Sequence, residues 1–342
     1  MVHQVYLADR PAPFSAGEDE TILQAGLRQG LPLPFGCQSG GCASCRVRLR
    51  SGDIEYPFAP PALSAAEIEA GYVLMCLARP RSDLVLELHQ PPQLDQLRPQ
   101  QFPVRLQSRQ WLCHDVLGLT LKLPRGSTFT YLPGQYLDFL LDDGHRRSFS
   151  IANAPNGETL DLQVRVTPEG RFANWAAHQM PERAILRVEA PLGAFYLRED
   201  RQQPILMMAG GTGLAPLHAM LERWLPQGNA RPVTLYWGVR SRRDLYLHER
   251  LTAWATDHPE HFRYVPVLSE PDADWEGARG LVHEVLMQQQ PALALHDVYL
   301  SGPPAMVRAG KEAFLGRGLD ADRLFYDSFE DAFTTWPGRG DG

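Results

Sequence analysis

Hydrophobic and polar positions alternate with different periods in three successive segments of the chain. In the first segment, Val2 to Ala8 and Leu84 to Leu88 alternate as strands do, with neighbouring side chains on opposite faces. Between them, Thr21 to Gln29 places apolar residues near helical spacing, and Gly30 follows as a stop signal. This pattern predicts a small domain that mixes strands with a helix.

The middle segment consists of short alternating runs separated by turn residues such as Pro155-Asn156-Gly157. Short strands at this spacing are typical of an antiparallel β-barrel or sandwich. The runs are Val104 to Leu106, Leu117 to Leu123, Gln135 to Leu141, Leu160 to Val166 and Ala184 to Val188.

The last segment alternates apolar strands with amphipathic helices, an order that predicts a parallel, doubly wound sheet. The expected strands are Ile205 to Ala209, Val233 to Trp237, Arg263 to Leu268 and Asp297 to Leu300. The expected helices are Leu214 to Leu225, Leu247 to Asp257, Leu281 to Gln289 and Ala305 to Leu315.

Two polar stretches divide these segments. Gln90 to Pro103 is dominated by Pro and Gln without apolar periodicity, which is typical of an inter-domain linker. A softer boundary falls in the polar run from Arg198 to Pro204. We therefore expect a multidomain protein of mixed α+β and α/β class, with domains over residues 1–92, 103–200 and 201–342.

Composition narrows the functional classes. A chain of 342 residues with a formal net charge of −7 is a poor candidate for binding nucleic acid or anionic membranes. The N-terminal residues show no targeting pattern, and the apolar run from Ile205 to Ala209 is far too short to span a bilayer. We expect a cytoplasmic protein that is a monomer when free.

Four of the five cysteines point to a metal or cluster site. Cys37, Cys42 and Cys45 form C-x4-C-x2-C, and Cys76 follows as a single distant cysteine. This spacing fits a plant-type [2Fe–2S] cluster, and the small residues between the cysteines allow backbone amides to point at the sulfurs. A zinc site is the alternative, although zinc prefers paired C-x2-4-C knuckles. Cys113 has no matching partners and is expected to be an ordinary half-buried thiol.

The first 90 or so residues resemble a plant-type ferredoxin. The entry Phe35-Gly36-Cys37, the glycine pair Gly40-Gly41 and the lone distal Cys76 all match that family. The resemblance implies a β-grasp fold with the cluster near the surface at one edge.

The middle segment resembles the flavin domain of the ferredoxin–NADP⁺ reductase superfamily. Arg147-Ser148-Phe149-Ser150 matches its R-x-Y-S/T motif, and Pro133-Gly134-Gln135-Tyr136 recurs there as well. The resemblance implies that Arg147 pairs with the pyrophosphate of FAD, that an aromatic ring lies against the isoalloxazine, and that Ser150 hydrogen-bonds the N5 atom, where hydride arrives. FAD rather than FMN rests on this resemblance alone.

A second phosphate element of the same superfamily is G-R-x-S/T at the start of a helix. The corresponding residues are Gly170, Arg171, Phe172 and Ala173. The helix N-terminus still offers amides to a pyrophosphate, but Ala173 lacks the family's hydroxyl, and Asn174 is a candidate replacement. Pro191-Leu192-Gly193 and Phe195 match the closing segment of the family's barrel.

The last segment carries a glycine turn between a strand and a helix, where backbone amides can approach a pyrophosphate. Its G-T-G-x-A-P pattern resembles the nicotinamide-binding motif of the same superfamily, which implies contacts from Gly211, Thr212, Gly213 and Pro216. Trp237-Gly238-Val239-Arg240-Ser241 stands at the end of the following strand, near the place where that family meets the adenosine ribose. Arg240, Arg242 and Arg243 are candidates to bind the 2′-phosphate of NADPH, and a solvated charge cluster at a loop is the alternative. The choice between the two cofactors stays open, and we favour NADH.

Two further elements resemble the hydride-transfer end of that family. Ser301-Gly302 stands where the family usually has a cysteine before the glycine, which puts a small polar group near the nicotinamide. Phe329 follows Tyr326-Asp327-Ser328 and resembles the terminal aromatic residue at the flavin's far face, with ordinary packing as the alternative. The resemblance implies Ser150, Ser301 and Phe329 as catalytic residues.

The order of the three segments is similar to that of the reductase components of bacterial ring-hydroxylating dioxygenases. The resemblance implies an NAD(P)H:acceptor oxidoreductase that passes electrons from NADH through FAD and a [2Fe–2S] cluster to a partner oxygenase. Reductases of diiron monooxygenases and deoxysugar dehydrases share this plan and remain alternatives. A non-enzymatic iron–sulfur carrier or sensor is a third hypothesis, against which the intact flavin and nicotinamide motifs argue.

Overall fold

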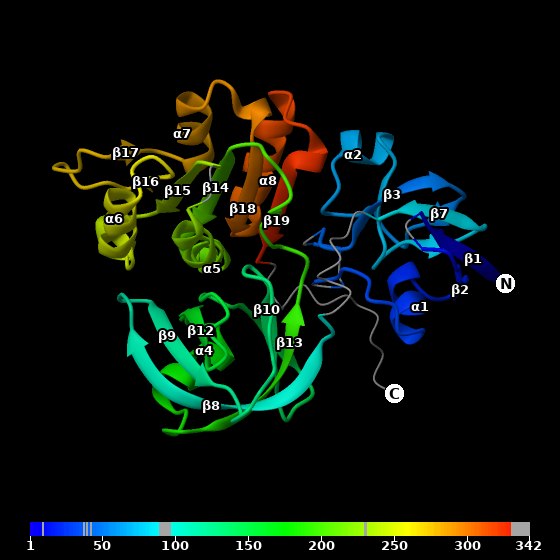
Figure 1. The fold of residues 1–342 in the computed structure, drawn as a ribbon, viewed down its shortest axis with the longest axis horizontal. Helices are drawn as coiled ribbons and strands as arrows, with labels where there is room; N and C mark the ends of the chain where they lie inside the picture. The colour runs from blue at the N-terminus through cyan, green and yellow to red at the C-terminus, as the bar shows by residue number, and fades with distance from the viewer. Residues whose placement is uncertain are drawn as a thin grey trace. The chain divides into compact units, whose positions relative to one another are not determined.

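The computed structural model describes residues 1–8, 10–36, 38, 40–41, 43–88, 97–228 and 231–329. The chain divides into two compact units, with the division between Arg98 and Pro99. Figure 1 shows the elements of both units, and each unit is described by itself below. Among the described residues, no helix is both long and apolar enough to cross a membrane.

The first unit is built on a mixed five-stranded sheet with the order β2-β1-β7-β3-β5. Strands β1 and β7 pair in parallel and the other neighbours are antiparallel. The strands are β1 (Val2–Leu7), β2 (Phe14–Gly17), β3 (Arg46–Ser51), β5 (Tyr72–Leu74) and β7 (Leu84–Glu87), and a separate ribbon pairs β4 (Ile54–Glu55) with β6 (Arg79–Pro80). This arrangement, with a helix against the sheet, is the expected β-grasp fold.

The two helices in the described part of the first unit begin at capping boxes. In α1 (Ile22–Arg28), the Thr21 side chain accepts from the amide of Gln24, whose side chain accepts in turn from the Thr21 amide. Ser64 and Glu67 repeat the arrangement at α2 (Ala65–Glu69). Each box satisfies amides that have no intrahelical partner, and α1 then buries its apolar residues together with the sheet.

The second unit begins with a six-stranded antiparallel sheet of order β11-β10-β13-β8-β9-β12. A bridge from Ile151, just after β11, to Leu162 on β12 joins the two ends of this order, so the sheet closes into the expected barrel. The strands are β8 (Gln100–Trp111), β9 (Val116–Lys122), β10 (Tyr136–Leu140), β11 (Arg146–Ser150), β12 (Thr159–Arg165) and β13 (Ile185–Leu192), with helix α4 (Arg171–His178).

The predicted linker differs from the structure at its C-terminal end. Residues Gln100 to Pro103 form the start of β8, although their composition reads as linker. Pro103 pairs with Arg187 on β13, whereas the pairing of β8 with β9 begins only at Arg105. At Pro103 the strand therefore has one neighbour, and the missing amide costs no ladder bond. Residues 90–96 of the linker lie outside the described residues.

The rest of the second unit is a parallel sheet of order β17-β16-β15-β14-β18-β19. Its strands are β14 (Ile205–Gly210), β15 (Val233–Val239), β16 (Phe262–Leu268), β17 (Ala278–Arg279), β18 (Asp297–Gly302) and β19 (Leu324–Ser328). Its helices are α5 (Leu214–Trp224), α6 (His248–Asp257), α7 (Val282–Gln289) and α8 (Pro304–Gly316), with short 3-10 turns η1 (Gly211–Gly213), η2 (Leu225–Gln227), η3 (Arg242–Asp244), η4 (Leu293–Leu295) and η5 (Ala321–Arg323). This is the doubly wound sheet that the sequence predicts.

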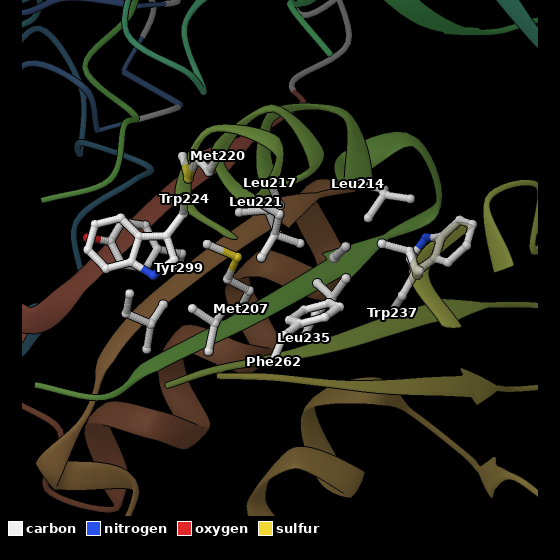
Figure 2. Close-up of a cluster of buried hydrophobic side chains, with 14 of the residues drawn as sticks. Met207, Leu214, Leu217, Met220, Leu221, Trp224, Leu235, Trp237, Phe262 and Tyr299 are labelled. Atoms are coloured by element: carbon white, nitrogen blue, oxygen red, sulfur yellow. The ribbon is translucent and has the colours of Figure 1, made fainter. Parts of the chain in front are cut away.

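Helix α5 lies on one face of the parallel sheet, with α7 and α8 on the other (Figure 1). Figure 2 shows Leu217 and Leu221 of α5 pointing at Met207 and Leu235 of the two central strands. All four side chains are fully buried. Burial of side chains of this size contributes about 1.5–3 kcal/mol each, so this contact fixes where α5 begins relative to the strand ends.

The segment that joins the barrel to the parallel sheet is anchored by Arg231. Its guanidinium donates to the carbonyl oxygens of Arg198 and Gln203, at 2.7 Å each, and to a carboxylate oxygen of Asp297 at 2.8 Å. Both Arg231 and Asp297 are buried. A buried charge needs a partner of this kind, so the connection is tied to the sheet that follows it.

Candidate functional site

Two of the four predicted cluster ligands lie in the described part of the chain. Cys45 directly precedes β3, Cys76 follows β5, and both thiols are buried. The amide of Cys76 donates to the sulfur of Cys45 at 3.4 Å. Amide-to-sulfur bonds of this kind stabilise thiolate ligands. Cys37 and Cys42 lie outside the described residues.

The backbone around these cysteines adopts an unusual conformation. Gln38, Gly40 and Ala43 all have positive φ, which is uncommon for Gln and Ala. A Cβ on Gly40 would lie 2.4 Å from the Leu77 side chain, and the Gly40 carbonyl accepts a hydrogen bond from Ala62 at 3.1 Å. The described part of this loop is therefore tightly wrapped beside Cys76, as a cluster enclosed by backbone requires.

Tyr56 lies close to the two described cysteines. Its hydroxyl oxygen accepts a hydrogen bond from the amide of Leu74 at 3.0 Å, and burial raises the pKa of Tyr56 to about 12. Tyr56 is therefore neutral at physiological pH. Arg46, on the strand that follows Cys45, is paired with the buried Glu67 at 2.6 Å.

The predicted flavin motif lies on β11. Alternation along the strand places Arg147 and Phe149 on one face and Ser148 and Ser150 on the other. Ser148 donates to Asp138 of the neighbouring strand at 2.6 Å. The Ser148 side chain is thus bonded to the neighbouring barrel strand on the face away from the core. The Ser150 side chain, on the same face, lies 3.5 Å from Asp327 of the parallel sheet.

Phe149 belongs to an aromatic group at one end of the barrel. Its ring centroid lies 5.8 Å from that of Phe139 and 5.4 Å from that of Phe172, and the rings of Phe139 and Phe172 are 4.7 Å apart. Phe149 remains partly exposed while Phe139 and Phe172 are buried. The barrel core therefore holds the ring in place and leaves part of it accessible.

Helix α4 offers an anion site next to this motif. It begins after Gly170 with no side-chain cap, so the amides of Arg171, Phe172 and Ala173 have no intrahelical partner. The Asn174 side chain donates to the carbonyl oxygens of Thr167 and Gly170, which holds the preceding turn. Open amides, an exposed Arg171 and the positive end of the helix suit a pyrophosphate. Asn174 holds the turn through these contacts, and whether it replaces the family's hydroxyl stays a prediction.

The two other flavin-family segments contact each other. A Cβ on Gly134 would lie 2.4 Å from the Phe195 carbonyl oxygen, and Gln135 donates to the carbonyl oxygen of Gly193 at 2.9 Å. The P-G-Q-Y turn and the closing segment of the barrel therefore form one packed wall beside β11.

The glycine turn at the end of β14 packs against the end of β18. A Cβ on Gly213 would lie 2.1 Å from the carbonyl oxygen of Ser301, and one on Gly302 would lie 2.8 Å from that of Gly210. Gly302 has a φ of 141°, and Gly211 a φ of 54°. Any side chain at Gly213 would collide with the backbone of Ser301, so this close approach of the two strand ends requires glycine.

The turn occupies the position where nucleotides bind in this class of sheet. Strands β14 and β18 are adjacent, and their crossovers lead to opposite sides of the sheet order. Ligands bind at the carboxyl ends of strands at such a switch point. Thr212 lies in η1 between Gly211 and Gly213, and Pro216 is buried in the first turn of α5, whose N-terminus has no side-chain cap. These residues suit a dinucleotide pyrophosphate.

Ser301 is the last polar side chain of β18 before Gly302. It is fully buried, and its Oγ finds no hydrogen-bond partner among the described residues. An orphaned buried hydroxyl is costly and calls for an explanation, and a ligand at the strand end would provide one. Ser301 is paired in register with Asp327 of β19.

Asp327 connects the sheet to the flavin motif. The Oγ of Ser150 lies 3.5 Å from its Oδ2, and the amide of Phe329 donates to the carbonyl oxygen of Gly302 at 3.0 Å. The structure thus brings Ser150, Ser301 and Phe329 to one edge of the sheet. Sequence reasoning did not select Asp327, although a carboxylate ending an apolar parallel strand is a usable signal.

The predicted ribose end lies after β15. Arg240, Arg242 and Arg243 are all exposed. Arg242 lies over the Trp275 ring at 5.4 Å and 3.4 Å from a carboxylate oxygen of Asp274. One of the three arginines is therefore held by protein groups.

Comparison with known proteins identifies the family of each part of the chain. Family models match the 2Fe-2S iron-sulfur cluster binding domain over residues 5–81, the oxidoreductase FAD-binding domain over 103–196 and the oxidoreductase NAD-binding domain over 207–312. The first match supports the [2Fe–2S] cluster over a zinc site.

Relatives of similar length match nearly the whole chain. The CDP-6-deoxy-L-threo-D-glycero-4-hexulose-3-dehydrase reductase of Yersinia pestis is 35% identical, covering 92% of this chain and 95% of the relative. Reductase component 2 of terephthalate 1,2-dioxygenase from Comamonas is 32% identical over 98% of this chain and 99% of the relative.

Among solved structures, the Amycolatopsis cytochrome P450 reductase GcoB has a TM-score of 0.73 and 30% identity, with 96% of this chain and 98% of that chain covered. The chain therefore belongs to the family of iron–sulfur flavoprotein reductases, NAD(P)H-dependent oxidoreductases that join a [2Fe–2S] ferredoxin domain to FAD-binding and NAD-binding domains.

Proposed function

We propose that this reductase passes electrons from NADH through FAD and its [2Fe–2S] cluster to a partner oxygenase, an aromatic-ring-hydroxylating dioxygenase. The observation that carries the electron route is the meeting of Ser150, from the flavin motif, with Asp327 and Ser301 at the switch point of the parallel sheet. The partner class rests on the similarity to the terephthalate dioxygenase reductase over 98% of the chain.

FAD accepts two electrons from the nicotinamide as a hydride and releases them singly, and the [2Fe–2S] cluster carries one electron at a time. The residues of the barrel hold and orient FAD. The pyrophosphate of FAD is bound by Arg147 and by the open amides of Arg171, Phe172 and Ala173. Phe149 presents a fixed aromatic ring to the isoalloxazine. Ser150 offers its hydroxyl at the reacting edge.

The parallel sheet holds the nicotinamide cofactor. The backbone of Gly211, Thr212 and Gly213 and the start of α5 at Pro216 bind its pyrophosphate, with Gly302 keeping the neighbouring strand end close. The Ser301 hydroxyl gains a polar partner when the nicotinamide binds. Phe329 covers the same edge, anchored by its amide.

We infer a preference for NADH. Arg242 is engaged by Asp274 and Trp275, which leaves Arg240 and Arg243 as exposed cations near the ribose. A 2′-phosphate is usually held by several charge-assisted bonds, and NADPH is bound less well where one of the nearby cations is already occupied.

The four cysteines Cys37, Cys42, Cys45 and Cys76 hold the cluster, and covalent linkage of the ferredoxin domain raises the local concentration of electron acceptor. The cysteines in the described part of the chain form no disulfide, which suits the reducing cytoplasm, where we place the protein. We expect it to be a monomer until it meets its partner.

A dehydrase is the second candidate partner, because the Yersinia dehydrase reductase is 35% identical over 92% of this chain. Purified dioxygenase and dehydrase components, each mixed with the reductase and NADH, distinguish the two by which one turns over its substrate. If only the dehydrase turns over its substrate, the partner is a dehydrase and the proposed dioxygenase partner is wrong.

The electron route itself is tested by an anaerobic titration of the purified protein with NADH, followed in the visible spectrum. Flavin and iron–sulfide bands that bleach together are the expected result. Cluster bands without flavin, or no bleaching with either NADH or NADPH, would overturn the reductase route and leave a carrier or sensor.

A further inference from the structure

A second group of metal-ligating side chains lies in the turn between β8 and β9, which is no part of the sites described above. Cys113, His114 and Asp115 are consecutive, and one ligand atom from each lies within 4.8 Å of the others. The Cys113 thiol donates to Asp115 Oδ1 at 3.3 Å, and His114 Nε2 lies 3.9 Å from the same oxygen. Three kinds of donor atom thus converge on one point.

These separations suit a zinc ion. Zinc binds Cys sulfur at about 2.3 Å, His nitrogen at about 2.0–2.1 Å and carboxylate oxygen at about 2.0–2.2 Å in a tetrahedron, which places neighbouring ligand atoms roughly 3.4–3.6 Å apart. The observed 3.3 Å and 3.9 Å fall on either side of this range. The Cys113 and His114 ligand atoms lie within 4.8 Å of each other, so side-chain movements of up to about 1 Å in these exposed or half-buried residues would complete the geometry.

A fourth residue orients the imidazole from the other side. His114 Nδ1 lies 3.5 Å from Oδ1 of Asp244, which is buried in the η3 turn. The other oxygen of Asp244 accepts from the amide and the hydroxyl of Ser241, at 2.8 Å and 2.9 Å, so the carboxylate is fixed. Metal-bound histidines almost always donate their second ring N–H to a carboxylate of this kind.

Arg165 is ion-paired to Asp115 and leaves the oxygen that faces the other two ligands available. Arg165 Nη1 pairs with Oδ2 of Asp115 at 2.8 Å, whereas Oδ1 faces the thiol and the imidazole. Arg165 therefore holds the carboxylate in an orientation that presents Oδ1 to the cluster. An outer-shell hydrogen bond to a ligating carboxylate is also a common feature of metal sites.

We propose that Cys113 Sγ, His114 Nε2 and Asp115 Oδ1 bind one zinc ion, with water as the fourth ligand and Asp244 as the orienting carboxylate. On binding, the S–H bond of Cys113 breaks, its proton leaves to solvent, and a sulfur–zinc bond forms. Asp244 comes from the nicotinamide part and the three ligands from the barrel, so the zinc-bound His114 links the two. The proposal does not depend on the electron-transfer function.

The test uses the holoenzyme, freed of loose metal by a chelating resin and titrated with Zn²⁺ against a fluorescent zinc indicator. We expect one tight equivalent per chain. X-ray absorption at the zinc edge of that sample should give one sulfur neighbour at about 2.3 Å and nitrogen or oxygen neighbours at about 2.0–2.2 Å. No tight equivalent, or several sulfur neighbours together with loss of the cluster's visible bands, would overturn the proposal.

Variants separate this site from other histidine–carboxylate pairs. Cys113→Ser and His114→Gln should each weaken zinc binding by more than tenfold, and Asp244→Asn by about tenfold. The His114 side chain is 40% exposed, so its replacement leaves the fold intact even if Cys113→Ser does not. His145→Gln is the matched control, because His145 Nδ1 lies 3.2 Å from a carboxylate oxygen of Asp143 in a pair that includes no thiol. The zinc affinity of this variant should equal that of the wild type. Equal affinity in wild type and His114→Gln would sink the idea.

Discussion

The imidazole Nδ1 of His218 lies 2.7 Å from the carbonyl oxygen of Ala152. A carbonyl oxygen only accepts, so Nδ1 carries the proton, while the buried Nε2 finds no partner among the described residues. Burial lowers the pKa of His218 to about 4, so the ring is neutral at physiological pH. The bond ties helix α5, which follows the glycine turn, to the chain just beyond Ser150.

This bond predicts a pH dependence of stability. The folded protein keeps His218 neutral down to about pH 4, whereas the unfolded chain protonates it near pH 6.5. The unfolded state therefore binds more protons between these values, so the contribution of His218 is fully present above pH 6.5 and is lost as the pH falls toward 4. The free energy of unfolding that is lost in this way is of order 3 kcal/mol.

Denaturant unfolding at a series of pH values, for wild type and His218→Gln, measures this contribution. Glutamine keeps a donor for Ala152 but does not titrate, so its stability should fall less steeply between pH 6.5 and 4. Parallel curves for the two proteins would assign the pH dependence to other groups.

Gly213→Ala should damage nicotinamide binding while flavin remains bound. Its Cβ would lie 2.1 Å from the Ser301 carbonyl oxygen, and backbone at that position cannot move aside cheaply. Overpacking of this kind costs about 1–3 kcal/mol, so the KM for NADH should rise about tenfold or more. Steady-state kinetics with an artificial acceptor and the flavin absorbance check both parts.

Gly316→Ala is the control for that substitution. Gly316 lies at the end of α8 with no atom within 4 Å of an added Cβ. It should be neutral or stabilising by about 0.5–1 kcal/mol. An unchanged KM in Gly213→Ala would mean that the close packing of the two strand ends does not govern nicotinamide binding.

Two glycines of the first unit form a matched pair for the cluster loop. Gly40 and Gly30 have φ values of 85° and 74°, so alanine costs roughly 1–2 kcal/mol of backbone strain at either position. Only at Gly40 would the Cβ also strike Leu77, at 2.4 Å, beside Cys76. Gly40→Ala should therefore lose iron and sulfide while Gly30→Ala keeps them, as chemical analysis and the visible spectrum would show. Full cluster content in both variants would contradict the tight wrapping.

Ser301→Ala should separate stability from activity. Removing a buried hydroxyl without a partner relieves a desolvation cost of about 1–3 kcal/mol, so thermal stability should rise. The rate of flavin reduction by NADH, measured by stopped flow, should fall, because the hydroxyl is the polar group at the end of β18. Ser127→Ala, which removes an acceptor for the amide of Phe129, should lower stability and leave that rate unchanged. A less stable Ser301→Ala with an unchanged rate would make Ser301 an ordinary core residue.

Periodicity predicted most strands and helices because each depends on its own residues. Strand β14 and helix α5 differ from their predicted bounds by one residue at one end. Composition failed at Gln100 to Pro103, because strand pairing is set by distant Arg187 and its neighbours, which a local pattern does not contain.

In the candidate site too, features formed by contiguous residues were predicted and features formed by distant residues were missed. Its glycine turn and R-S-F-S motif were visible because they are contiguous, and whether each predicted residue contacts a cofactor stays a prediction. Asp327 and His218 were not selected, since their partners Ser150 and Ala152 are far away in the sequence. His218 does carry a signal, as the one histidine among the largely apolar residues of α5.

The anchoring of Arg231 governs how this enzyme can be recombined. Its guanidinium holds the backbone of Arg198 and Gln203 and neutralises Asp297. A chimera that takes its parallel sheet from a relative, with the seam placed after Gln203, would pair a foreign arginine with a connection of the wrong shape. A seam ahead of Arg198 transfers the Arg231 guanidinium together with the carbonyl oxygens and the Asp297 carboxylate that it binds. The interchangeable part of the chain therefore begins within the connection and not at the first strand of the sheet.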